Sequence, residues 1–394
     1  MTPNFLSEAQ NLKENTITLR RDFHQHPELG LEEQRTSKIV AEELNKLGLD
    51  VRTGIAQTGV VGILQGAKPG KTVMLRFDMD ALPIQEENQV DYVSQVPGVM
   101  HACGHDGHTA IGLTVARMLS GHKDDLAGRF MFVFQPSEEG ITGIYGAQKM
   151  VAEDVLTDPK PDHLLALHLW NYMPIGWMAM PPGPMMASLD LFRIRVHGRG
   201  GHAAAPQNNV DPLLAACQLV CALQSIASRN VPPVDAAVVS VAMVNGGTSP
   251  NVTPSLVTLE GTLRTYKPQI RDLVIERMQA LSDGITTGLG CTAEVEVYAS
   301  NPAVANDPDV AALCQQTVAE LFPDWQVDTS YQTMLSEDCA FFLEQVPGCF
   351  MLLGSANQEK GLTIPHHNSR FDFDEEVMPL ASALLTETAC RLSE

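Results

Sequence analysis

Residues 100–108, with the sequence MHACGHDGH, combine three histidines, a cysteine and an aspartate directly ahead of an apolar, helix-like run. Cys103 and His105 are two positions apart, so in an extended segment their side chains point to the same side, close enough to hold one metal ion. A loop of surface histidines with one small buried cysteine is the alternative. Matching ligand types elsewhere in the chain make a metal site the favoured interpretation.

Three apolar, strand-like runs end in polar residues that are able to join this loop. The runs cover residues 73–77, 130–134 and 164–167, and the polar residues that follow them are Asp78 and Asp80, Glu138 and Glu139, and His168. Helix-like patterns between these runs predict a parallel sheet covered on both faces. Sites in such sheets form at the carboxyl ends of the strands, so we expect these side chains to gather along one edge with Cys103.

Length, charge and composition limit the architecture and the partners. Two domains are the default expectation for 394 residues. The formal charge of −21 would repel nucleic acid and anionic lipid, and no apolar run of about 18 residues or more is present. The first residues lack the basic and apolar regions of a signal peptide. We therefore predict a cytoplasmic protein with neither nucleic acid nor a membrane as a partner.

The eight cysteines include no CxxC pair and show no regular spacing, which argues against a disulfide framework. Cys217 and Cys221 are four positions apart on an expected helix, and we predict that both are small core residues. The cysteines other than these two and Cys103 are also expected to be core or incidental residues.

The PPGP sequence at residues 181–184 indicates a domain boundary. The following elements are expected to be a strand, a helix, two strands, a helix and a strand, at residues 189–197, 211–228, 236–244, 255–263, 270–286 and 292–298. This βαββαβ order is the ferredoxin-like arrangement. The α/β pattern then resumes, so we predict an α/β domain formed by residues 1–184 and 300–394, with residues 185–299 inserted as a second domain.

Five motifs occur in a fixed order along the chain: DMDALP at 78–83, MHACGHD at 100–106, QPSEEG at 135–140, GHA at 201–203 followed by Pro206, and SED at 336–338. Together they resemble the M20 metallopeptidase family, specifically its amidohydrolase branch of hippurate hydrolase-like, N-acetyl-amino-acid deacetylase-like and auxin-conjugate hydrolase-like enzymes. The resemblance runs from about residue 24 to residue 378. It implies a zinc-peptidase-like catalytic domain interrupted by a ferredoxin-like lid and dimerisation domain, and a homodimer or larger homo-oligomer.

The resemblance also implies five metal ligands, namely Cys103, His105, Glu139, His168 and His367. Five ligands suit two divalent ions with the thiolate bridging them, and these ligand types are compatible with Zn, Mn, Ni or Co. The family pattern selects His367 rather than His366. Two departures from the family pattern are Ser369, where a proline is usual, and a thinned glycine run after the EEG sequence.

Glu138 resembles the general base, which takes a proton from water and passes it to the leaving amine. His202 resembles the residue that stabilises the oxyanion. Asp80 and Asp106 resemble residues that orient the ligands, as metal-bound histidines usually require.

Asn251 and Arg264 match family positions that hold the substrate carboxylate, a task for which a guanidinium is well shaped. From pattern alone, Arg264 would be a solvated charge, and His202 is equally compatible with a solvated loop residue.

The combined prediction is a metal-dependent amidohydrolase that cleaves the amide bond of an N-acetyl, N-benzoyl or similar N-acyl amino acid to give a carboxylate and a free amino acid. One alternative is a dipeptidase or carboxypeptidase on the same scaffold. A second is a metal-free thiol hydrolase that uses Cys103 with His105 or His108. A third is a non-catalytic binding protein that retains the metal pocket.

Overall fold

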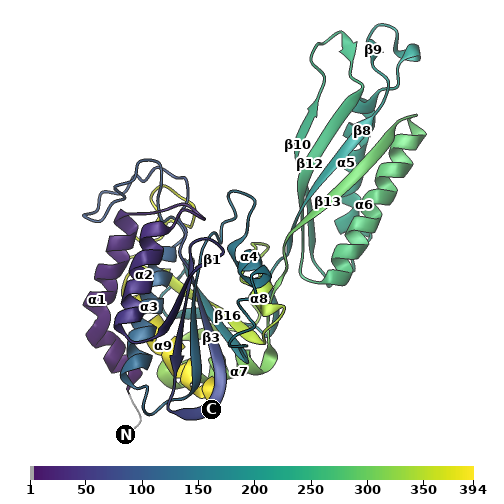
Figure 1. Ribbon diagram of the computed structural model, residues 1–394. Helices are drawn as coiled ribbons and strands as arrows, with labels where there is room; N and C mark the ends of the chain where they lie inside the picture. Colours follow the sequence, from purple (N-terminus) through teal and green to yellow (C-terminus); the bar gives the residue numbers. More distant parts are fainter. Residues whose placement is uncertain (1–3) are drawn as a thin grey trace. The chain divides into compact units, whose positions relative to one another are not determined.

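The computed structural model describes residues 4–394, which form two compact units (Figure 1). Unit 1 contains residues 4–183, Ala305–Tyr331 and Asp338–Glu394, and unit 2 contains Pro184–Val304 and Gln332–Glu337. The short segment Gln332–Glu337 was not expected in unit 2. Residues 1–3, part of the stretch from which we predicted that a signal peptide is absent, lie outside the described residues. Within residues 4–394, no helix has both the length and the apolar character needed to cross a membrane.

Unit 1 is built on an eight-stranded sheet with the order β1-β2-β4-β3-β5-β16-β6-β15. Its centre consists of four parallel strands: β4 (Ala127–Gln135), β3 (Lys68–Asp78), β5 (His163–Pro174) and β16 (Gly348–Ala356). The apolar residues of these strands are buried almost throughout, because helices cover both faces of a parallel sheet. The expected strands are therefore present, with Asp78 at the end of β3 and Glu138 and Glu139 just beyond β4. His168, which was expected at a strand end, lies in the middle of β5, because that strand continues to Pro174.

The edges of this sheet differ from the expected all-parallel arrangement. Strands β1 (Asp50–Ile55) and β2 (Gly59–Gln65) are antiparallel to each other, and β2 is antiparallel to β4. A connection of only three residues joins β1 to β2, and so short a connection requires antiparallel strands. At the other edge, β6 (Trp177–Ala179) runs antiparallel to β16, and β15 (Gln326–Asp328) is parallel to β6. The sheet of this α/β unit is therefore mixed.

The helices of unit 1 pack on this sheet and on one another. They are α1 (Phe5–Gln25), α2 (Gln34–Lys46), α3 (His105–Gly121), α4 (Gly146–Ala152), α7 (Pro308–Leu321), α8 (Ala340–Leu343) and α9 (Val377–Ser393). Helices α3 and α9 contact β3 and each other, and α1 contacts both helices. Helix α3 is buried along most of its length, which fixes the position of its first residue, His105.

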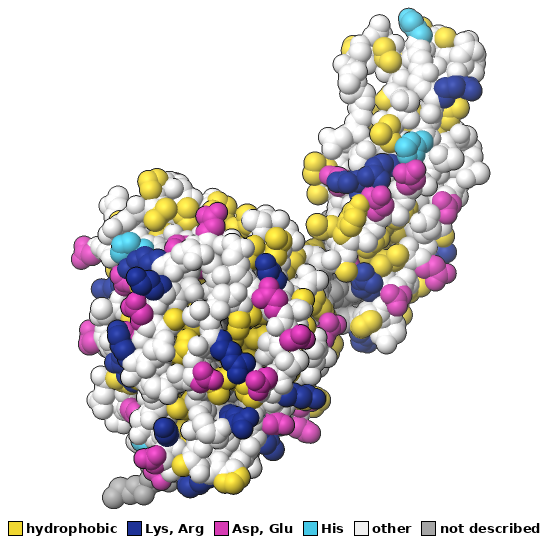
Figure 2. Space-filling model, viewed as in Figure 1, with side chains coloured by type: hydrophobic (Ala, Val, Ile, Leu, Met, Phe, Trp, Pro, Cys, Tyr) yellow, Lys and Arg dark blue, Asp and Glu magenta, His cyan; other side chains and the backbone are white. Residues whose placement is uncertain are grey.

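Unit 2 contains β8 (Leu189–His197), α5 (Pro212–Arg229), β10 (Ala237–Gly246), β12 (Leu256–Thr265), α6 (Pro268–Gly288) and β13 (Thr292–Asn301), in that order. The four strands form an antiparallel sheet with the order β10-β12-β8-β13. Helices α5 and α6 bury one face of it around a separate apolar core. On the other face, ion pairs such as Arg193–Glu260 and Arg195–Glu296 lie partly exposed, and Figure 2 shows acidic and basic side chains side by side there.

Four short strands and one 3-10 helix complete the fold: β7 (Gly183–Met186), β9 (Gly201–His202), η1 (Pro206–Asn208), β11 (Val252–Thr253) and β14 (Val304–Asn306). Strands β9 and β11 pair with each other, with His202 opposite Val252. The chain passes between the units at four points, at residues 183/184, 304/305, 331/332 and 337/338. The first two of these points lie within β7 and β14.

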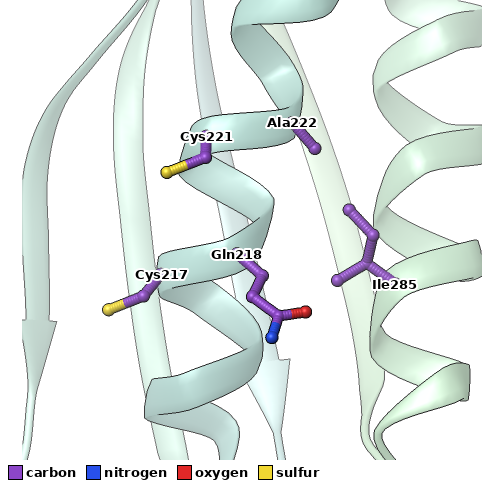
Figure 3. Close-up of a pocket in the computed structure, with 5 residues that line it drawn as sticks. All are labelled: Cys217, Gln218, Cys221, Ala222 and Ile285. Carbon is purple, nitrogen blue, oxygen red and sulfur yellow. The ribbon is translucent and has the colours of Figure 1, made fainter.

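The prediction that Cys217 and Cys221 are core residues is wrong, because both are exposed on α5. In Figure 3 their sulfur atoms point away from Ile285 on the neighbouring helix, and both residues line a shallow hollow. The buried face of α5 includes Ala215, Ala216, Leu219, Leu223 and Ile226. Each residue turns a helix by about 100°, so Cys217, two residues beyond Ala215, lies on the opposite flank. The spacing of the two cysteines was correct for a helix, but their face was misassigned.

Candidate metal centre

The loop before α3 brings Cys103 and His105 together by a turn, whereas we had expected an extended segment. Gly104 is the N-cap of α3 and has a φ of 96°, in the left-handed region that glycine adopts without steric cost. Cys103 is 7% exposed, and His105, the first helical residue, is fully buried. The conformation of Gly104 therefore sets the relative direction of the thiol and the imidazole.

The five predicted ligands form two adjoining groups. The ligand atoms of Cys103, His105 and His168 lie within 4.8 Å of one another, and so do those of Cys103, Glu139 and His367. The Cys103 Sγ atom is 3.4 Å from His168 Nε2, and Glu139 Oε1 is 3.0 Å from His367 Nε2. Cys103 belongs to both groups, so a single sulfur atom connects them.

The orientation of the two buried histidines suits metal binding. His105 Nδ1 lies 2.9 Å from the Asp80 carbonyl oxygen and 3.2 Å from its Oδ1, and His168 Nδ1 donates to the Leu169 carbonyl oxygen over 2.6 Å. Such contacts fix the ring so that the other nitrogen faces the metal. The His105 Nε2 atom is buried and has no hydrogen-bond partner among the described residues. A buried ring nitrogen of this kind beside a thiol and carboxylates is suited to binding a divalent cation.

The electrostatics of the cluster also fit a cation. Burial, followed by the charges of Glu139 and Glu138, raises the pKa of the Cys103 thiol well above its usual value. Burial acts to lower the pKa of His105, but Asp78 and Asp80 outweigh it and raise that pKa to about 10. Metal ligands must be deprotonated, so a divalent cation would release these protons on binding.

Glu138 and Glu139 follow a tight turn at the end of β4. Ser137 has a φ of 50°, and the next two carboxylates make different contacts. Glu138 Oε1 accepts the Asp338 N–H over 3.4 Å, and its Oε2 lies 3.9 Å from His105 Nε2. The Glu139 N–H donates to Asp80 Oδ2 over 3.0 Å. Asp80 therefore contacts both the Cys103–His105 side and the Glu139 side of the cluster.

Asp106 lies behind the cluster in a buried network of charges. Its Oδ2 atom is 2.8 Å from Arg20 Nε and 2.7 Å from His24 Nδ1, and all three side chains are fully buried. Burial alone would raise the pKa of Asp106, but Arg20 and His24 hold it well below its usual value. Asp106 thus anchors the first turn of α3 rather than a ligand side chain.

Arg20 and His24 were not singled out by the sequence analysis. Both lie on α1, one turn apart, on the same side as the buried residues Thr16 and Phe23. That spacing was the available signal, but a charged residue on a buried helix face is uncommon enough to be passed over.

Two further histidines near the cluster are already engaged. His108 Nδ1 is 2.6 Å from Asp78 Oδ1, and His108 Nε2 accepts the Leu169 N–H. His366 Nε2 accepts the Asn171 N–H over 3.0 Å, which leaves His367 as the better placed of the two neighbouring histidines. The position of His367 beside Glu139 agrees with the ligand that the family pattern selected.

An aromatic group that the sequence analysis did not single out borders the cluster. It consists of Trp170, Tyr172, Tyr331 and His366. The ring centroids of His168 and Trp170 are 6.0 Å apart, and Trp170 Nε1 donates to the Tyr331 hydroxyl over 3.1 Å. Tyr172 is 52% exposed. Nothing in the local sequence marked these residues, because they come from β5 and from two distant loops.

The remaining predicted site residues lie in unit 2. His202 and Asn251 are exposed on the paired segments β9 and β11, where the Ala203 N–H donates to the Asn251 carbonyl oxygen. Arg264 lies near the far end of β12, eight residues beyond Leu256, and donates to the Met334 carbonyl oxygen over 2.9 Å. At about 3.3 Å per residue, it is roughly 25 Å along the strand from the β9–β11 end. Unit 2 therefore brings His202 and Asn251 together but places Arg264 apart from them.

Comparison with known proteins identifies the family of the chain. The model of peptidase family M20/M25/M40 matches residues 74–391. Over 381 residues the chain is 36% identical to thermostable carboxypeptidase 1 of Saccharolobus solfataricus, with 95% of each chain covered. Over 374 residues it is 36% identical to the N-acetylcysteine deacetylase of Bacillus subtilis, again with 95% of each covered.

A solved structure of a dinuclear metal-binding peptidase of the M20 family from Bacillus subtilis superimposes with a TM-score of 0.86 and 33% identity, covering 97% of this chain and 98% of that one. Relatives of this kind are hydrolases, and the paired ligand groups around Cys103 agree with two metal positions. The chain is an enzyme of the M20 peptidase family.

Proposed function

We propose that this enzyme is a metal-dependent amidohydrolase that cleaves N-acyl amino acids, with Cys103, His105, Glu139, His168 and His367 as the ligands of two divalent ions. The observation that carries the proposal is the pair of ligand groups sharing Cys103, with the Glu138 carboxylate beside them. The similarity to an N-acetylcysteine deacetylase supports an N-acyl amino acid as the substrate class. Zn, Mn, Ni and Co all remain candidates for the metal.

When bound, divalent ions supply Lewis-acid polarisation of the amide carbonyl and acidify water. Glu138 then acts as the general base, because its carboxylate lies next to His105 Nε2 at the edge of the cluster. It accepts a proton from water and donates it to the leaving amine. The Asp338 N–H donates to Glu138 Oε1 over 3.4 Å, which supports the orientation of the carboxylate.

Asp80 and Asp106 act by positioning. Asp80 contacts His105 Nδ1 and the Glu139 N–H, so it fixes two ligands relative to each other. Asp106 holds the first turn of α3 against Arg20. Neither carboxylate needs to touch the substrate for this role.

Unit 2 is proposed to be a ferredoxin-like lid and dimerisation domain. Its βαββαβ element order and its sheet order support that assignment. We assign oxyanion stabilisation to His202 and substrate carboxylate binding to Asn251 and Arg264, as the family motifs imply. A homodimer and a cytoplasmic location complete the proposal.

A carboxypeptidase or dipeptidase is the second candidate function, and the 36% identity to a thermostable carboxypeptidase favours it. Both candidates require the same metal cluster, so only the substrate separates them. Burial of Cys103 and its raised pKa disfavour the thiol hydrolase alternative, which needs an accessible thiolate.

The test is to strip the protein of metal, add back Zn, Mn, Ni or Co separately, and measure amine release from N-acetyl, N-benzoyl and indole-acetyl amino acids and from dipeptides. We expect release only with metal and faster release from N-acyl amino acids. Faster cleavage of dipeptides would select the second candidate. Release without metal would support the thiol hydrolase, and metal binding without any release would support a non-catalytic protein.

A further inference from the structure

Glu33 occupies the N-cap position of α2 but does not cap that helix. Its side chain makes no hydrogen bond to the first turn. The free N–H groups there are satisfied instead by Glu28, whose two oxygens accept the Arg35 and Thr36 N–H groups over 2.9 and 2.8 Å. Since N-cap residues usually satisfy these groups themselves, Glu33 is available for another role.

The Glu33 carboxyl group points to the turn that precedes Glu138. Its Oε1 atom accepts the Ser137 N–H over 2.9 Å, and its Oε2 atom accepts the Thr58 hydroxyl over 2.6 Å. Glu33 is fully buried, and Thr58 and Ser137 are 2% and 1% exposed. The side chain therefore connects the start of α2 with the β1–β2 connection and the loop that carries the base.

Ser137 adopts a conformation that needs support from its surroundings. Its φ of 50° lies in the left-handed region, which is sterically unfavourable for a residue with a side chain. Its hydroxyl donates to the Ile144 carbonyl oxygen, and its own carbonyl oxygen accepts the Gly146 N–H. Gly30 leaves room for the Ser137 side chain, because a Cβ atom at residue 30 would lie only 2.7 Å from Ser137 Oγ. Of these contacts, only the one from Glu33 fixes the Ser137 N–H.

We infer that Glu33 is a positioning residue for the general base, which acts by holding Ser137 in its left-handed conformation so that the Glu138 and Glu139 side chains diverge. Only the expected effect of Glu33 on turnover rests on the proposed function. The hydrogen bond and its effect on the turn hold for the protein in any case. Neither the Glu33 nor the Thr58 side chain is a metal ligand in this arrangement.

The role requires a hydrogen-bond acceptor and not a charge. Burial, followed by the nearby charge of Asp80, raises the pKa of Glu33 to about 8. A glutamine reproduces an uncharged side chain of the same shape and keeps one acceptor oxygen for the Ser137 N–H. Glu33→Gln should therefore rescue what Glu33→Ala loses.

The experiment compares Glu33→Ala, Glu33→Gln and Thr58→Val with Glu28→Ala, a matched control that removes two hydrogen bonds to α2 without touching the turn. In the metal-loaded enzyme, we expect Glu33→Ala to lower kcat about 10- to 100-fold, with KM within about twofold of the unmodified enzyme, because small misplacement of a reacting group costs that much. We expect kcat within about threefold for Glu33→Gln and an intermediate value for Thr58→Val. Glu28→Ala should lower the melting temperature and leave kcat unchanged.

Bound metal, measured by mass spectrometry, should be the same in all variants. Deuterium exchange of a peptide covering residues 135–146 should be faster in Glu33→Ala than in Glu28→Ala, a readout that does not depend on turnover. Equal exchange in these two variants would overturn the inference. If the unmodified enzyme is active, an equal kcat in Glu33→Ala would also overturn it, and so would a loss of kcat that is explained by a loss of bound metal. If the unmodified enzyme hydrolyses nothing while the exchange difference is present, the proposed function fails and the positioning role stands.

Discussion

In unit 1 the charged side chains behind the candidate metal centre are buried and paired, whereas ion pairs such as Arg195–Glu296 in unit 2 lie partly exposed on an open sheet face. Arg20 and Asp106 both have fully buried side chains, while those of Arg195 and Glu296 are 29% and 39% exposed. A buried charge that loses its partner costs several kcal/mol, but an exposed pair contributes little. Replacing a charge of the buried network in unit 1 should therefore destabilise the fold strongly, whereas replacing an exposed charge or an exposed histidine of unit 2 should leave folding unchanged.

The largest effect is expected from Glu138→Gln in unit 1. Removing the general base should lower kcat by about a thousandfold, because general-base catalysis contributes on the order of 10²–10⁴. Metal content should stay unchanged, since Glu138 is not among the five ligands. Single-turnover amine release and metal analysis measure both quantities. Glu139→Gln is the control and should lose metal as well as activity; retained turnover in Glu138→Gln would refute the assigned base.

Asp106→Asn should be the most destabilising change. It leaves the buried Arg20 guanidinium without one of its carboxylate partners, which costs about 3–5 kcal/mol. Urea unfolding of the metal-free protein measures this loss. The control is Glu296→Gln in unit 2, whose exposed pair with Arg195 should leave the unfolding midpoint unchanged. Equal stability losses in the two variants would remove the contrast between the units.

His202→Ala should separate function from folding in unit 2. If His202 stabilises the oxyanion, kcat should fall about 100-fold, as for other lost oxyanion donors. The melting temperature should not change, because His202 is exposed on β9. His197→Ala, at a second and partly exposed histidine in unit 2, should alter neither quantity. Unchanged kcat in His202→Ala would make it a solvated loop residue.

The smallest effect is expected from Glu86→Gln, on the free energy of unfolding at acid pH. Burial acts to raise the pKa of Glu86, but hydrogen bonding and charge from His24 outweigh it and lower that pKa below its usual value. Its stabilising contribution is therefore present above the unfolded-state pKa and is lost as the pH falls through the folded-state pKa. Glu86→Gln should flatten the stability profile below about pH 4.5 and cost roughly 1 kcal/mol or less at pH 7. Unfolding at pH 3.5–7 tests this, and an unaltered acid slope would contradict it.

Local motifs predicted the parts of the site that depend on short stretches of chain. Cys103, His105 and Glu139 are marked by their spacing and by the strands that precede them, and the structure places them in one cluster. Glu33 and Thr58 could not be predicted, because Glu33 meets Ser137 across 104 positions of sequence and Thr58 meets Glu33 across 25. Hydrogen bonds between distant segments leave no periodic pattern.

The fold shows the same division between local and distant information. The buried strands and long helices were predicted because the spacing of apolar residues along the sequence indicates each of them directly. Strand β1 was missed since it is mostly exposed, and β6 and β15 were missed since three residues are too few for a pattern. The turn at Ser137 was also hidden, because its left-handed φ is not marked by a glycine.

Because Cys103 belongs to both ligand groups, oxidation of its sulfur atom would affect both of them. Oxidation of a cysteine to a sulfinic or sulfonic acid removes a thiolate ligand permanently. Because the same sulfur serves both groups, one oxidised atom would disable both metal positions together. Inactivation by peroxide should then be an all-or-none event for each molecule, with no half-loaded form accumulating.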